Sequence, residues 1–129
     1  MPRYVMIKHY RGTPPTVNDH PMDEWSTAEV EDHLRYMNDF ADRLRAGGEF
    51  VDSQALAAES IFVRAAPDGS GPETTPVPAD NSLVAGWMMI DVASHERALE
   101  LAAELSAEPG KGGNPIHEWL ELRPVLGDH

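Results

Sequence analysis

The chain has 129 residues, 41% of them apolar, and a formal net charge of −12 at pH 7. That length suits a single domain, residues 1–129, whose core needs no covalent staples. The lack of cysteine excludes disulfides and thiolate chemistry. The acidic balance argues against nucleic acid and anionic membranes as partners, because both require clustered Lys and Arg.

The first half of the chain predicts a strand, a helix and a strand. Residues 3–10 are rich in Tyr, Val, Met and Ile, which is typical of a buried strand. A helix is expected to begin at Ser26, since Ser26 and Glu29 have the spacing of a capping box, and to end at Gly47-Gly48. Residues 49–56 predict the second strand. The N-terminal residues are too often interrupted by polar groups for a signal peptide, so we expect a cytoplasmic protein.

Two regions are expected to be loops. Residues 11–25 are rich in Gly, Pro, Asn and Asp. Residues 60–64 predict a short strand that turns at residues 67–69, and residues 66–82 hold four prolines and two glycines, too many for a regular element.

The last part of the chain repeats the strand–helix–strand order. Residues 83–92 predict a strand, and Ser94 is the expected cap of a second helix. The inner stripe of this helix is expected at Ala98, Leu101, Ala102 and Leu105. The final strand is predicted over residues 116–125.

This order predicts a ferredoxin-like α+β fold, with an antiparallel sheet and both helices on one face. The other face should also carry apolar side chains, among them Trp87, Met89, Trp119 and Val125. A second copy of the sheet would cover them, so we expect a homodimer through the helix-free face with a barrel-like interior.

Four segments, taken in order, carry a family resemblance: Tyr4–Ile7, Gly47–Glu49, Gly86–Asp91 and Glu121–Val125. Through them the chain resembles the YCII-related, or DGPF-domain, family of dimeric α+β barrel proteins over nearly its whole length. The stretches His9–Gly12 and Ile116–Pro124 look like an actinobacterial branch of that family.

The chain departs from the family where the motif that names it is expected. Asp-Gly-Pro-Phe would fall near residues 74–77, where the proline alone is kept, and Asn81 stands near the place of a family lysine. The resemblance implies small lyases or dehalogenases that act on hydroxylated aromatics through a histidine and an aspartate. The histidine corresponds to His33, whereas the aspartate would lie near residues 45–47, which are Arg, Ala and Gly.

Histidines are the leading candidates for chemistry, because imidazole changes charge near neutral pH. His33 borders the apolar face of the first helix, and the alternative is a structural histidine bonded to backbone. His9 ends the first strand, His117 begins the last, and Asp52 lies on the second. A pocket lined by these four residues is one hypothesis; four unconnected side chains are the other.

Two further residues are candidates for substrate binding. Arg123 shares a strand face with Glu121, so it would bind an anion or form an interface ion pair. Trp87 would contact substrate or anchor an interface. The acidic residues and His20 of residues 19–24 match no metal-ligand spacing, and no cofactor fingerprint is present, so we expect neither metal nor cofactor.

Two function classes follow. The first is a cofactor-free enzyme of lyase or isomerase type, in which His33 moves a proton, His9 or His117 assists, and Arg123 holds an anion. The substrate would be small and aromatic or enolisable. The second is a non-catalytic protein that binds a metabolite or a protein partner. Genes of the YCII-like family often lie beside sigma-factor genes, and the resemblance therefore implies a regulatory association for this class.

Overall fold

A computed structural model describes residues 2–9, 24–57, 59–77 and 84–126. The regular elements in chain order are β1 (Arg3–His9), α1 (Thr27–Ala46), β2 (Phe50–Ala55), β3 (Ile61–Ala65), β4 (Pro72–Pro76), β5 (Val84–Asp91), α2 (His95–Ser106), a 3-10 turn η2 (Lys111–Gly113) and β6 (Glu121–Pro124).

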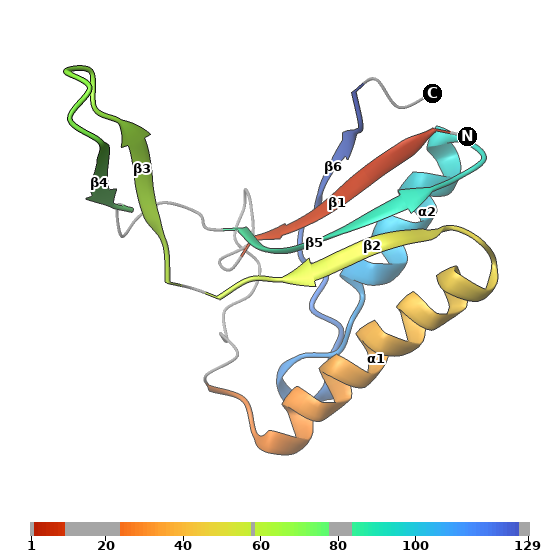
Figure 1. The fold of residues 1–129 in the computed structure, drawn as a ribbon. Helices are drawn as coiled ribbons and strands as arrows, with labels where there is room; N and C mark the ends of the chain where they lie inside the picture. The colour runs from red at the N-terminus through yellow and green to blue at the C-terminus, as the bar shows by residue number, and fades with distance from the viewer. Residues whose placement is uncertain (1, 10–23, 58, 78–83, 127–129) are drawn as a thin grey trace.

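A four-stranded sheet in the order β2-β5-β1-β6 forms the centre of the molecule. Each of its three neighbouring pairs is antiparallel. Helices α1 and α2 connect its strands and pack against one face (Figure 1). This is a ferredoxin-like α+β arrangement, and it confirms the fold class predicted from the sequence.

Both helices begin where the capping residues predict. Ser26 accepts a hydrogen bond from the Glu29 amide and its own amide donates to the Glu29 carboxylate, so the capping box before α1 is complete. After α1 the chain turns through Gly48, whose φ of 78° is the left-handed conformation that glycine adopts without strain. Ser94 caps α2 by accepting from the Arg97 amide.

The core lies between the sheet and the helices. Tyr4 and Met6 of β1 and Met88 and Ile90 of β5 alternate toward the helices, where they meet the inner helix faces. The helix residues buried against them are Phe40, Leu44, Ala98, Leu101 and Leu105. The predicted inner stripe of α2 is therefore confirmed.

Two predicted elements are wrong in part. β4 occupies Pro72–Pro76, inside a region predicted to be irregular. Its prolines are tolerated because they lie at the two ends of an exposed two-stranded ribbon, where few backbone donors are needed. The last strand is confined to Glu121–Pro124, because the amides of Ile116 and His117 bond to the carbonyls of Glu108 and Ser106 instead of pairing with β1.

The described part of the chain contains no helix that is both long and apolar enough to cross a membrane.

Candidate functional site

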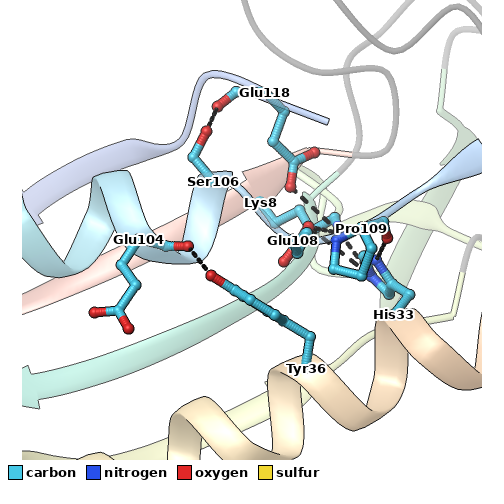
Figure 2. A network of polar contacts seen from close by, with 8 residues as sticks. All are labelled: Lys8, His33, Tyr36, Glu104, Ser106, Glu108, Pro109 and Glu118. Carbon is cyan, nitrogen blue, oxygen red and sulfur yellow. Dashed lines mark hydrogen bonds and ion pairs between the residues drawn. The ribbon is translucent and has the colours of Figure 1, made fainter. Parts of the chain in front are cut away.

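Four ionisable side chains meet between the sheet, α1 and the segment that follows α2 (Figure 2). The Lys8 ammonium lies 2.6 Å from Glu108 Oε1, 3.2 Å from His33 Nε2 and 3.4 Å from Glu118 Oε1. We call Lys8, His33, Glu108 and Glu118 the polar cluster. Its members come from positions up to 110 residues apart, so only the folded chain assembles it.

The periodicity of β1 and of α1 determines where the side chains of Lys8 and His33 point. Lys8 follows Tyr4 and Met6 at a spacing of two, and these point toward the helices, so its side chain enters the same space at the end of β1. His33 lies four residues before Met37 and seven before Phe40, on the buried stripe of α1.

Glu108 and Glu118 both lie on the segment between α2 and β6. Backbone bonds fold this segment back on itself: the Ile116 amide donates to the Glu108 carbonyl at 2.9 Å, and the His117 amide donates to the Ser106 carbonyl at 3.0 Å. The Ser106 hydroxyl also donates to the Glu118 carbonyl. Gly110 permits the tight packing, because a Cβ there would lie 2.8 Å from Ile116 Cγ1.

Both ring nitrogens of His33 are engaged. Nδ1 lies 3.0 Å from the Pro109 carbonyl oxygen, which can only accept, so Nδ1 carries the proton. Nε2 is then an acceptor and faces the Lys8 ammonium. Burial lowers the pKa of His33, and the Lys8 charge lowers it further. His33 is therefore neutral at pH 7, and the Trp25 ring packs edge-on against it at 5.2 Å between centroids.

The two glutamates differ in their protonation. Burial raises the pKa of Glu118 to about 8, and the adjacent Glu108 carboxyl adds to the increase, while Lys8 opposes it. Glu118 consequently holds its proton at neutral pH. Burial by itself lowers the pKa of Lys8, but the carboxylates of Glu108 and Glu118 outweigh it and raise the pKa.

Only one side chain of the polar cluster is appreciably exposed to solvent. The Lys8 side chain is 22% exposed, whereas the side chains of Glu108, His33 and Glu118 are at most 3% exposed. Two buried oxygens, Glu108 Oε2 and Glu118 Oε1, have no hydrogen-bond partner among the described residues. A molecule entering this region would therefore meet Lys8 first, with the two carboxyl groups directly behind it.

The structure does not bring the four predicted site residues together. His9 points to the helix-free face, opposite to Lys8, and its Nε2 lies 3.0 Å from Glu121 Oε1. Asp52 is exposed on β2 and accepts from the Ser53 amide. His117 is exposed with a φ of 54°, outside any strand. His33 is the one predicted residue that lies in the polar cluster.

The predicted binding residues lie on the helix-free face. Arg123 pairs with Val5 and Glu121 with Ile7, so both share that face, and Arg123 Nε lies 3.8 Å from Glu121 Oε2. Trp87 also pairs with Ile7, from the other side, and is half-buried. Among the described residues, no hydrogen bond or ion pair links these three side chains to the polar cluster.

Within the polar cluster, a protein side chain fills the position where a metal cation could bind. The Lys8 ammonium stands where one nitrogen and two carboxyl groups converge, the position that a bound cation would take. Within the described ranges no group of three His, Asp or Glu side chains is arranged to hold a metal ion. The loop residues Asp19, His20 and Asp23 lie outside the described residues.

Three members of the polar cluster were not predicted as site residues from the sequence: Lys8, Glu108 and Glu118. The alternation of side chains could have identified two of them. Lys8 lies two residues after Met6, on the side where Tyr4 and Met6 are buried. Glu118 lies two residues before Leu120, on the side of Leu120 and Leu122. A charged residue at a buried position is uncommon, and such residues are paired when they occur. Glu108 carries no comparable signal, since it stands in a Pro/Gly turn.

No protein-family model matches this chain, and no curated protein matches it either.

Proposed function

We propose that this chain is a YCII-like, cytoplasmic, cofactor-free enzyme that moves a proton on a small molecule, in a reaction of lyase or isomerase type. One arrangement carries the proposal: the buried Glu118 carboxyl, whose pKa burial raises to about 8, lies 3.4 Å from the Lys8 ammonium. A general acid is most effective when its pKa lies near the working pH. Groups with such shifts concentrate at functional sites.

Each member of the polar cluster has a distinct task in this proposal. In the molecules in which Glu118 is ionised, its carboxylate takes the proton from carbon, and the protonated carboxyl so formed returns a proton to the substrate. Lys8, the partly exposed member, contacts the substrate and stabilises negative charge as it develops on an oxygen. Glu108 balances the ammonium at 2.6 Å. His33 is a positioning residue, because its two nitrogens hold Pro109 and Lys8.

The substrate class follows from this chemistry. Proton transfer at carbon needs a neighbouring group that can take up the charge, such as a carbonyl or a hydroxylated aromatic ring. The Lys8 ammonium suits the resulting enolate or phenolate oxygen. We therefore propose a small enolisable or aromatic substrate.

We expect wild-type protein in D2O to exchange the acidic C–H of at least one compound in a panel of 2-oxo acids, 3-oxo acids and hydroxylated aromatics. Exchange reports proton transfer even when no product accumulates, and NMR measures it directly. The Glu118→Gln variant should lose 10²-fold or more of the rate, as expected for removal of a general acid–base group, roughly 10²–10⁴-fold.

The matched control for that experiment is Glu31→Gln, which removes one carboxylate from the exposed face of α1. It should exchange at the wild-type rate. Exchange that survives in Glu118→Gln, or a panel with no exchange at all, contradicts the proposal.

We also propose that the protein is a homodimer through the helix-free face. Val5, Ile7, Trp87 and Met89 lie on that face and are only half-buried, and an apolar sheet face of this kind needs a cover. Light scattering at micromolar concentration should give twice the chain mass of 14.2 kDa. Trp87→Glu places a charge at the centre of that face and should yield a folded monomer; a monomeric wild type contradicts the dimer.

The burial of the polar cluster favours a second candidate function, a non-catalytic metabolite-binding or regulatory protein. His33 and Glu108 are closed to solvent, and a closed network can serve to specify the fold rather than to react. In that case Glu118→Gln would change stability while no compound exchanged its protons. The D2O experiment therefore separates the two candidates.

A further inference from the structure

The β3–β4 hairpin, which we call the arm, stands clear of the rest of the molecule. Figure 1 shows it rising from beyond the end of β2, on the side away from α1. Every residue of both its strands is exposed. A two-stranded ribbon with no packing partner is at best marginally stable in water, so the arm needs a surface to pack against.

The arm carries apolar side chains on both of its faces. Ile61, Phe62 and Val63 are consecutive, so they alternate between the two faces, and they are 62%, 46% and 59% exposed. The arm also bears an open hollow of about 510 Å³, lined in part by Val63, Ala65 and Pro72. Adjacent exposed apolar residues of this kind mark an interaction surface.

Charge favours a second copy of this chain as the occupant. The helices carry eight acidic residues against four Arg, which would repel a second acidic chain. On the arm, in contrast, Arg64 pairs with Glu73 at 3.1 Å, and Asp68 leaves a net charge of only −1. On the helix-free face Arg3 pairs with Asp91 at 3.7 Å, and Asp52 is a further acidic residue there. These two surfaces therefore repel each other less than two helical faces would.

The dimensions also agree. A five-residue strand such as β3 spans about 17 Å, at about 3.4 Å per residue, and a four-stranded sheet is about 14 Å across, at about 4.8 Å per strand spacing. The arm is thus long enough to reach from the edge of a facing sheet to its inner strands.

We propose that the arm of each protomer docks on the helix-free face of the other, so that Ile61, Phe62 and Val63 clasp the partner in two symmetry-related contacts. Reciprocal contacts of this kind are what a two-fold interface produces. The inference rests on the homodimer proposed above and adds that the arm, in addition to the sheet, holds it together.

The chain has no cysteine, so paired cysteines test the contact directly. Val63→Cys and Met89→Cys chains with different affinity tags are mixed and treated with a short bis-maleimide. We expect a cross-linked species that carries both tags. Val63→Cys mixed with Leu99→Cys is the matched control, since Leu99 is exposed on α2, on the helix side of the sheet.

A second measurement asks whether the arm matters for dimer affinity. The triple variant Ile61→Ser, Phe62→Ser, Val63→Ser should weaken dimerisation at least tenfold, with an unchanged circular dichroism spectrum, while Thr75→Ser on β4 should not. A dimer with unchanged affinity, or Val63–Met89 cross-linking no stronger than the control, overturns the role of the arm and leaves the sheet dimer standing. A monomeric wild type overturns both.

Discussion

The Lys8→Met variant should lose about 3–5 kcal/mol of unfolding free energy at pH 7, the cost of breaking a buried ion pair by removing one partner. Methionine keeps most of the volume and apolar length of the lysine. Glu108, whose side chain is fully buried, would lose the ammonium 2.6 Å from it and have no counter-charge in the interior. Denaturant unfolding at pH 7 measures the loss.

The double variant Lys8→Met, Glu108→Gln is the control for that interpretation. It removes both charges together, so it should recover most of the stability lost by Lys8→Met. The two single variants and the double variant form a cycle that gives the coupling energy of the pair. A double variant as unstable as the sum of the two single ones would mean that the ion pair is not the cause.

Glu118→Gln should change how stability depends on pH. The folded pKa of Glu118, about 8, lies above its ordinary value of 4.5, chiefly because the side chain is buried. Between these values the folded state holds a proton that the unfolded state releases, so the wild-type unfolding free energy falls as pH rises. The fall is up to about 1.4 kcal/mol per pH unit and about 5 kcal/mol in all.

Glutamine resembles the protonated carboxyl and does not titrate, so the variant should match wild type at about pH 4 and below. It should become steadily more stable than wild type as pH rises from 4.5 to 8, and keep the full difference above pH 8. Denaturant unfolding at a series of pH values gives the two curves. Glu31→Gln, in the exposed part of α1, should leave the wild-type pH dependence unchanged. Parallel curves for wild type and Glu118→Gln would show that Glu118 is not the titrating group.

Local patterns in the sequence were enough to predict most of the fold. The helix boundaries depend on Ser26, Gly48 and Ser94, each of which acts within a few residues of itself. β4 was missed for the opposite reason. Its prolines argue against a central strand, and its position at the edge of a ribbon depends on pairing with β3 across the turn.

The polar cluster could be predicted only in part. His33 was singled out from its place on the apolar stripe of α1, yet its partners are 25 and 75 residues away along the chain. Nothing local links Lys8 to Glu108, 100 residues later. Their meeting depends on how the segment after α2 folds back beneath β1, and that is a property of tertiary packing.

The compensated charge of the polar cluster restricts how this chain can evolve. A lineage that loses Lys8 first keeps the buried Glu108 carboxyl without a counter-charge. A lineage that loses Glu108 first keeps the Lys8 ammonium with only the more distant Glu118 beside it. Either intermediate is expected to be less stable than the parent, so change at one of positions 8 and 108 favours change at the other. Descendants of this protein should therefore inherit the two residues together or replace them together.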